Sequence, residues 1–390
     1  MRPTKTYKFL STYMRSLFLI EGLYLAACRE PYTPPISQNS INYLVVSGFL
    51  NSGGPTYITL SRTRALSDTT PNQPELHAQV SVSGSQGEIM QLTEKGNGLY
   101  ESDQLNLNQG EEYQLQILTA NGAKYISDNV SLIYTPPIDS VNWTQVSSGA
   151  SNKLGVNIYV STHDNNASLG YYRWEYEETY EYNAVYESYS TYDSATKSFI
   201  PRDQSNYVYH CWTTNLSSGL ILGNTGQLSQ NIIYEQPVTF IPEGSVKLSV
   251  GYSILVRQFS ISQASYDYWV NLQQTNDLTG SIFDPTPSQV TGNVHNISNP
   301  GEPVMGYVSA TSAKEQRIFI SYHDVNHWGY EEPKGCIEYV LTPDQFYEYY
   351  AEKGYLPTGA KGPVNYGAAL PNCADCRTQG GSNQMPPFWQ

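Results

Sequence analysis

The chain has 390 residues, with 35 acidic and 21 basic side chains and a formal net charge of −14. Proteins that bind nucleic acid, or adhere by charge to anionic membranes, need basic patches, and no lysine or arginine cluster occurs beyond the N-terminal segment. Charged residues make up only 14%, against about 25% in an average soluble protein. The polar surface must therefore come from Ser, Thr, Asn, Gln and Tyr, a composition typical of exported β-proteins.

Residues 1–27 have the layout of a signal peptide. An apolar run that ends at Leu25 is too short to span a bilayer, and it follows a basic leader that contains Arg2, Lys5, Lys8 and Arg15. Two alanines then precede Cys28, which is the arrangement of a bacterial lipobox. We predict that the signal peptide is removed and that Cys28 is acylated. The alternative is an ordinary signal peptide followed by a chance cysteine, and Glu21 inside the apolar run favours that alternative.

Residues 28–40 are rich in proline and lack periodicity, which predicts a tether between the lipid and a folded body. Short runs of alternating apolar and polar residues begin at Tyr43. They are separated by glycine-containing and Asn-Gly turns, the pattern of antiparallel strands and hairpins. About seven such runs in roughly a hundred residues predict an immunoglobulin-like or transthyretin-like β-sandwich over residues 41–136. The Pro136-Pro137 pair ends this predicted domain.

Residues 137–390 are predicted to form a larger antiparallel β-rich domain with a few short helices. Strand patterns continue, for example in residues 154–160. Residues 262–275 instead repeat apolar side chains every fourth position, and Ser262 is placed to cap a helix. A second helix is predicted to begin at Thr342, because a cap residue followed by proline is a helix start signal.

Four cysteines follow the lipobox: Cys211, Cys336, Cys373 and Cys376. An even number in an exported chain predicts two disulfides, with three alternative connectivities. The CxxC spacing of the last two also occurs in zinc sites and redox pairs. A zinc site would need the first two cysteines to converge as single ligands, and a redox pair would need a strand–CxxC–helix setting. The Gly-, Asn- and Pro-rich tail around the motif favours structural disulfides.

No motif for nucleophilic, phosphate-binding or dinucleotide-binding chemistry occurs in the sequence. His323 and His327 are four residues apart, a spacing that on a helix would bring both to one metal. Asp324 stands where a zincin has glutamate, and residues 317–322 before the pair predict a strand. We therefore expect these histidines in a surface loop. The sequence predicts a protein that is not an enzyme and that holds no metal or cofactor.

One predicted strand, beginning at Tyr171, has the composition of a binding surface. Alternation along a strand places Tyr172, Trp174 and Tyr176 on the same face. Aromatic rows with polar tips stack on ligands and anchor interfaces, because they bury a large rigid area at little entropic cost. The alternative is that tyrosine, present 34 times, simply covers the exposed faces of an exported sheet.

The chain resembles a large family of Bacteroidota outer-membrane lipoproteins known only by a domain-of-unknown-function label. The similarity runs from the lipobox to the C-terminus and rests on many ordered short segments rather than on one motif. These segments are residues 28–32, 44–48, 98–100, 138–141, 252–258, 280–285, 292–294, 373–377, 380–381 and 388–389.

The resemblance implies a lipid-anchored, surface-exposed protein of the outer membrane that accompanies a TonB-dependent receptor. A lid-like or accessory role in nutrient uptake follows, with a glycan or peptide as ligand. The family has no established catalytic residues to transfer. Two other classes of function stay open from the sequence: a surface hydrolase that acts on glycans or peptides, and a structural component of the envelope.

Overall fold

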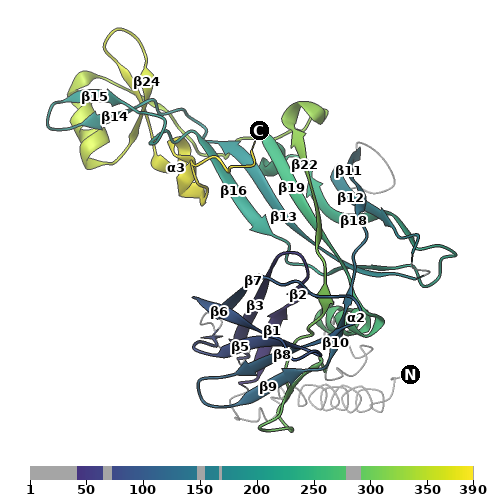
Figure 1. Ribbon diagram of the computed structural model, residues 1–390. Coiled ribbons are helices and arrows are strands. Elements are labelled where there is room, and N and C mark those ends of the chain that lie inside the picture. Colours follow the sequence, from purple (N-terminus) through teal and green to yellow (C-terminus); the bar gives the residue numbers. More distant parts are fainter. Residues whose placement is uncertain (1–41, 65–72, 147–153, 167–168, 278–290, 390) are drawn as a thin grey trace, which may run out of the picture. The chain divides into compact units, whose positions relative to one another are not determined.

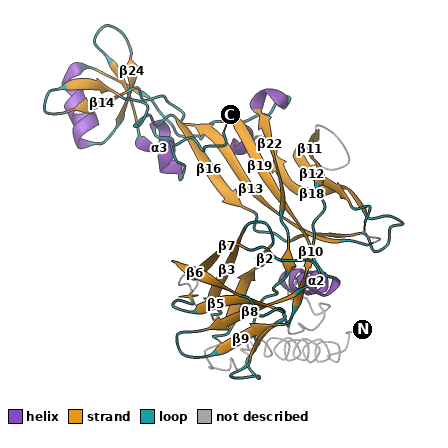
Figure 2. Cartoon of the chain, viewed as in Figure 1, coloured by secondary structure: helices purple, strands orange, loops and turns teal. Residues whose placement is uncertain are grey.

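The computed structural model describes residues 42–64, 73–146, 154–166, 169–277 and 291–389. The predicted signal peptide, the tether and Cys28 lie outside these ranges. The described residues among 43–63 and 73–389 belong to one compact unit. Strands dominate and the helices are few and short (Figures 1 and 2), which confirms the predicted mainly β fold with antiparallel sheets. No helix within the described ranges is both long and apolar enough to cross a bilayer.

The first sheet system wraps around one apolar core. The alternation predicted from the sequence is present: in β8 the side chains of Tyr113, Leu115 and Ile117 are buried, and the residues between them are less so. Its strand order is β1 (Leu44–Gly48), β3 (Pro55–Arg62), β7 (Leu99–Gln104), β6 (Ile89–Gly96), β5 (Gln79–Gly84), β8 (Glu112–Leu118), β10 (Val130–Ile133), β21 (Ala310–Thr311) and β2 (Leu50–Asn51), with β4 (Gln73–Pro74), β9 (Lys124–Ser127) and β20 (Val294–Asn296) at the side.

This core includes a segment from much later in the chain. Strand β20 pairs antiparallel with β9, and β21 pairs parallel with both β10 and β2. Val304, Val308 and Ala310 are buried among the side chains of the first sheet system. The sequence pattern of the first hundred residues does not contain this information, because the pairing joins strands about 170 residues apart in the chain.

Buried hydroxyl groups tie the two halves of the chain together where the sequence has Pro136-Pro137. The Thr135 amide donates to Ser312 Oγ at 3.1 Å, and Thr135 Oγ1 lies 3.1 Å from Thr311 Oγ1. The Ser260 amide donates to Thr135 Oγ1 at 2.9 Å. Because all these groups are buried, each bond also removes the cost of an unpaired polar atom.

A second sandwich follows, built from two sheets around its own core. Figure 1 shows β16, β13, β19 and β22 side by side. One sheet has the order β11 (Ile138–Val146), β12 (Gly155–His163), β18 (Ile232–Pro242). The other has β16 (His210–Leu216), β13 (Tyr171–Asn183), β19 (Gly251–Ser260), β22 (Lys314–Ser321), with β17 (Ile221–Asn224) also paired to β13.

The helix predicted over residues 262–275 is confirmed as α2 (Gln263–Asp277). Ser262 caps it as expected: the Ser265 amide donates to Ser262 Oγ at 3.1 Å. Thr342 also starts a helical segment, through a capping box with Gln345. That segment is a 3₁₀ turn, η3 (Pro343–Gln345), followed by a π-helix, η4 (Tyr347–Glu352), rather than a regular α-helix.

A small module combines residues 184–209 with the C-terminal residues after β22. Its core is aromatic: Phe199 stacks on Tyr366 at 3.9 Å between ring centroids, and Tyr192 and Phe346 pack around Tyr350. Besides η3 and η4, its elements are β14 (Ser190–Asp193), β15 (Ser198–Pro201), β23 (Tyr339–Leu341), β24 (Leu356–Ala360), β25 (Tyr366–Ala369), α3 (Pro371–Ala374) and η5 (Cys376–Gln379). Two more 3₁₀ turns, η1 (Val246–Leu248) and η2 (Tyr322–Asp324), flank the second sandwich and are not part of this module.

Two disulfides hold this module, as predicted from the even number of cysteines. Cys211 in β16 is bonded to Cys376, and Cys336 is bonded to Cys373. The two cysteines of the CxxC motif therefore have different partners, and neither is free for metal binding or redox exchange. All three connectivities fitted the sequence; the fold selects this one because it brings β16 beside η5.

Candidate binding surface

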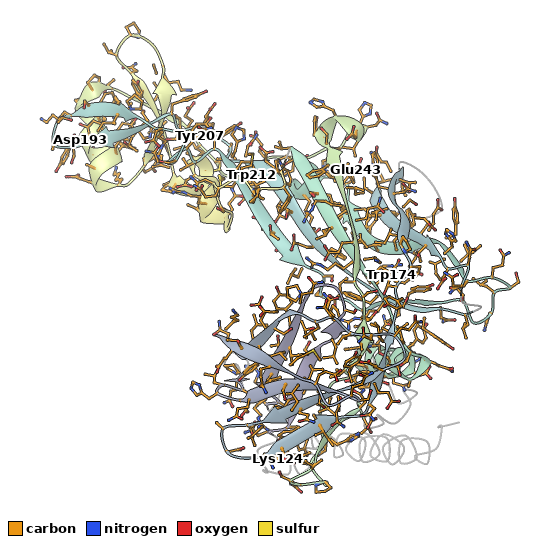
Figure 3. All side chains as sticks on the ribbon, viewed as in Figure 1. Lys124, Trp174, Asp193, Tyr207, Trp212 and Glu243 are labelled. Carbon is orange, nitrogen blue, oxygen red and sulfur yellow. A yellow bond between two sulfur atoms is a disulfide. The ribbon has the colours of Figure 1, made fainter. Side chains whose placement is uncertain are left out.

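The structure corrects the aromatic row expected on residues 171–176. Tyr172 and Trp174 are 1% and 0% exposed and lie in the core of the second sandwich, where Trp174 is labelled in Figure 3. Their polar atoms are satisfied internally: Tyr172 Oη donates to Asn231 Oδ1 at 3.0 Å, and Trp174 Nε1 donates to Gln258 Oε1 at 2.9 Å. Burial raises the pKa of Tyr172 to about 12. No exposed aromatic row for a ligand remains on this face.

Tyr176 continues the same inward face and is partly buried against that core. Its hydroxyl donates to Thr239 Oγ1 in β18 of the opposite sheet, at 3.2 Å. The alternation predicted from the sequence is right, but the face it selects is the inner one, because a second sheet covers it.

The outer face of the same strand carries charge instead. Alternation and the antiparallel register bring three residues of β13, Arg173, Glu175 and Glu177, close to Arg257 of the neighbouring strand β19. On the other side of β19, Glu315 and Arg317 of β22 also lie close to Arg257. We call these six residues the charged network. The sequence signal for this face is the R-x-E-x-E spacing between the aromatic residues, which the aromatic pattern of the same strand obscures.

Ion pairs join the charged network in two groups, one around Glu177 and Arg257 and the other formed by Arg173 with Glu175. Glu177 is shared by two cations: Arg317 Nη2 lies 3.0 Å from Glu177 Oε1, and Arg257 Nη2 lies 3.7 Å from Glu177 Oε2. Arg257 Nε also lies 2.8 Å from Glu315 Oε1, and Arg173 pairs with Glu175. All six side chains keep part of their surface in solvent, so both donors and acceptors are presented outward in fixed positions.

Aromatic rings flank the charged network. The Arg173 guanidinium lies over the Trp269 ring of α2 at 4.4 Å from the ring centroid, and that of Arg317 lies over Phe388 at 3.7 Å. The C-terminal residues therefore lie on this face. Trp389 Nε1 donates to Glu181 Oε2 at 3.3 Å, and its ring meets Phe319 edge-on.

A recess of about 910 Å³ opens beside the charged network. Residues 47–59 of the first sheet system form one wall, and Arg173, Glu175, Arg257 and Glu315 are among the residues that form another. Tyr57 in this wall is 49% exposed, and Phe49 packs edge-to-face on Phe259 at 4.6 Å. The wall turns at Gly48, where φ is +137° and a Cβ atom would lie 2.2 Å from the Tyr57 carbonyl oxygen, so only glycine fits.

Arg173, which lines the recess, carries one unsatisfied donor: its Nε is buried and makes no hydrogen bond within the described part of the chain. Tyrosine and arginine, both present around this cavity, are among the residues enriched in interface hot spots. This recess is the candidate binding site.

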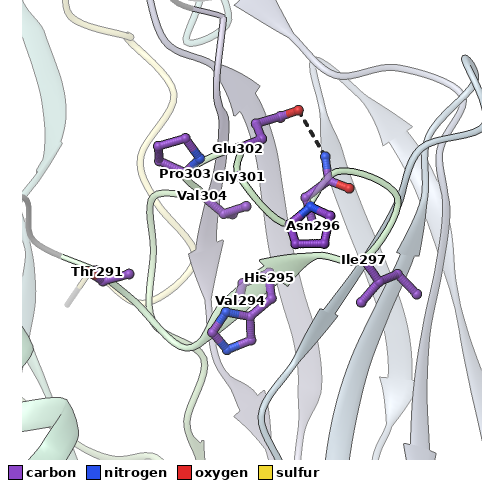
Figure 4. Close-up of a pocket in the computed structure, with 10 residues that line it drawn as sticks. Thr291, Val294, His295, Asn296, Ile297, Gly301, Glu302, Pro303 and Val304 are labelled. Carbon is purple, nitrogen blue, oxygen red and sulfur yellow. Dashed lines mark hydrogen bonds between the residues drawn. The ribbon is translucent and has the colours of Figure 1, made fainter.

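A second recess, of about 550 Å³, lies along residues 291–304 (Figure 4). Its polar groups serve the protein itself: Asn296 Nδ2 donates to Glu302 Oε2 at 2.9 Å, and Tyr125 Oη donates to Glu302 Oε1 at 2.9 Å. His295 Nε2 lies 2.9 Å from Asp128 Oδ1. These contacts hold the loop against β9, so this recess is a weaker candidate.

The remaining residues considered from the sequence do not come together. His323 lies in the short turn η2 and His327 follows it, and both are exposed. Within the described ranges, no group of three or more His, Cys, Asp or Glu side chains is arranged to hold a metal ion.

Replacing Glu177 with glutamine is expected to lower the free energy of unfolding by about 1–2 kcal/mol, because it removes the charge shared by Arg257 and Arg317. Urea unfolding measures the change, and added salt should reduce it. The matched control is Glu331→Gln, since Glu331 is 80% exposed and lies 3.9 Å from Lys334. That control should change stability by less than about 0.5 kcal/mol, and equal effects for the two variants would contradict a cooperative network.

Comparison with known proteins places this mainly β chain in a family. It belongs to the family described as a domain of unknown function (DUF4249), whose family model matches residues 29–317. No curated protein matches the sequence.

Three solved structures show weak similarity. A DUF4785 family protein from Legionella pneumophila is 14% identical, with 57% of this chain and 54% of that chain covered and a TM-score of 0.17. Trypsin-activated alpha-2-macroglobulin from Escherichia coli is 11% identical, with 60% of this chain and 15% of that chain covered and a TM-score of 0.18. Chitinase ChiA74 from Bacillus thuringiensis is 16% identical, with 53% of this chain and 29% of that chain covered and a TM-score of 0.15. This chain therefore spans about half or less of each, and such TM-scores support no conclusion about fold or function.

Proposed function

We propose that this protein is a non-enzymatic binding protein, anchored by a lipid on Cys28 to the outer membrane and exposed at the cell surface. We propose further that it is an accessory subunit of a TonB-dependent nutrient-uptake system. The observation that carries the binding role is the recess beside the charged network, with the exposed Tyr57 and the ion-paired side chains of Arg173, Glu175, Arg257 and Glu315 at its walls.

The state of the carboxylates in the recess favours binding over catalysis. Glu175 is paired with Arg173, and Glu315 is paired with Arg257. A general acid needs a carboxyl group that is free to give a proton to the substrate. Carboxylates held in ion pairs are suited to accept hydrogen bonds from a ligand.

The anchor and the disulfides support an extracytoplasmic location. Disulfides persist in oxidising compartments and are rare in the cytosol. Fourteen residues lie between Cys28 and Tyr43, which directly precedes the first strand, β1. Such a span extends to about 50 Å at most, which gives the body reach to a partner in the same membrane.

The experiment compares the wild-type protein with Cys28→Ser in its native host. The wild type should incorporate an alkyne-tagged palmitate and fractionate with the outer membrane, and the variant should lose both properties. After mild cross-linking, affinity purification of the wild type should recover a β-barrel receptor. Equal labelling of the two proteins would contradict the anchor, and recovery of the wild type alone would contradict the accessory role.

A further inference from the structure

Strand β16 is an edge strand, and its edge is partly open. In the sheet order β16-β13-β19-β22 it pairs with β13 only. The register places Trp212 opposite Glu181, Thr214 opposite Thr179, and Leu216 opposite Glu177. An edge strand presents a row of main-chain N–H and C=O groups that a further strand can pair with.

The chain's own C-terminal segment already uses this edge at one position. The Trp212 amide donates to the Ser382 carbonyl at 2.8 Å, and the Ser382 amide donates to the Trp212 carbonyl at 2.9 Å. The main-chain groups of Trp212 therefore point away from β13. Because these directions alternate along an antiparallel strand, the groups of Thr214 and Leu216 point the same way.

Beyond Trp212 the edge is exposed and unguarded. Within the part of the chain that the structure describes, no strand pairs with β16 on this side at Thr214 or Leu216. Leu216 is 70% exposed, and Thr214 is exposed too. Natural edge strands are commonly blunted by lysine, proline or a covering element, whereas residues 213–216 read Thr-Thr-Asn-Leu.

The open edge borders the candidate binding site. Leu216 lines the recess together with Arg173 and Glu175. Strand β17 pairs with β13 further along, opposite residues 171–174, so the open stretch is confined to the end of β16. A segment seated at this edge has the recess next to it.

From this placement we infer that the edge of β16 at Thr214 and Leu216 takes an extended polypeptide segment as an added strand, with side chains of that segment in the recess. The inference rests on the proposed binding role and names its ligand class. Regularly spaced main-chain donors and acceptors are matched by another polypeptide main chain and not by a glycan. The recess offers both charge signs, Arg173 and Arg257 with Glu175 and Glu315, which suits side chains of mixed charge.

The test uses the full-length lipoprotein in detergent and, as the probe, a phage-displayed library of random linear 12-residue peptides. Enriched peptides should bind Thr214→Pro and Leu216→Lys at least tenfold more weakly than the wild type. Thr214→Pro removes a main-chain N–H that points away from β13 and does not bond to it. Leu216→Lys leaves the main chain unchanged and places at the edge a charged side chain of the kind that discourages pairing with a further strand. Leu228→Lys is the matched control, because Leu228 is 55% exposed and does not line the recess.

Hydrogen exchange gives an independent readout: bound peptide should slow exchange in fragments covering residues 212–217. Failure to enrich any peptide, equal affinity for Leu216→Lys and the wild type, or unchanged exchange would each overturn the inference. Binding of maltoheptaose in the recess, unaffected by Leu216→Lys, would also overturn it while leaving the proposed binding role in place. The cross-linking experiment on the anchored protein tests that role separately.

Discussion

Trp174→Ala is expected to lower the free energy of unfolding by about 3–5 kcal/mol, the range typical for truncating a buried aromatic side chain. Trp174 is fully buried, stacks on Tyr172 at 5.7 Å between ring centroids, and donates its indole N–H to Gln258. The ring also lies so close to Gly223 that a Cβ atom there would be 2.9 Å from Cζ3. Chemical denaturation of the purified protein measures the change.

The matched control is Tyr234→Ala, because Tyr234 is 77% exposed and lies in the same sandwich. It should change stability by less than about 0.5 kcal/mol. If Trp174→Ala behaved like this control and lost only ligand binding, the assignment of Trp174 to the core would be wrong, and the aromatic row expected from the sequence would be restored.

Replacing both Cys211 and Cys376 with serine is expected to cost about 2–5 kcal/mol, since removal of a native disulfide frees a large loop in the unfolded chain. The bond joins residues 165 apart in sequence and links β16 to η5. Unfolding in urea, followed by far-ultraviolet circular dichroism, measures the loss.

The second disulfide provides an internal comparison, because Cys336 and Cys373 are only 37 residues apart. On loop entropy alone, serine replacement of this pair should cost about 1 kcal/mol less than replacement of the first pair. Equal costs, or the reverse order, would show that native packing in the aromatic module outweighs loop closure. Peptide mapping of the wild type without reductant should recover these two pairs and no others.

Some features follow from local sequence alone. The alternating runs that begin after Tyr43 and the serine before α2 each depend on neighbours in the chain, and both are found as predicted, the former for example in β8. The even number of cysteines also predicts two disulfides without knowledge of the fold, because that prediction needs only the cysteine count and the expectation that the chain is exported. Their pairing required the fold, because Cys373 and Cys376 are three residues apart yet bond to cysteines in different segments.

The binding surface shows the limit of the sequence most clearly. A period of two divides the residues of β13 into an aromatic set and a charged set, and it gives no information about which set faces another sheet. The covering sheet β11-β12-β18 buries Tyr172 and Trp174 and leaves Arg173, Glu175 and Glu177 outside. The composition of the aromatic set favours a binding surface, but Arg173 and Glu175 of the opposite set line the recess.

Local sequence establishes that this chain is mainly β and acidic, and it predicts the two disulfides and a lipobox before the folded part. Each of these depends on composition, local periodicity or a contiguous motif. Three features come from packing in three dimensions: residues 294–311 complete the first core, Cys211 pairs with Cys376 and Cys336 with Cys373, and the charged face of β13 and the open end of β16 border one recess. These features join residues far apart in the chain, and their positions are set by packing, which no local pattern encodes.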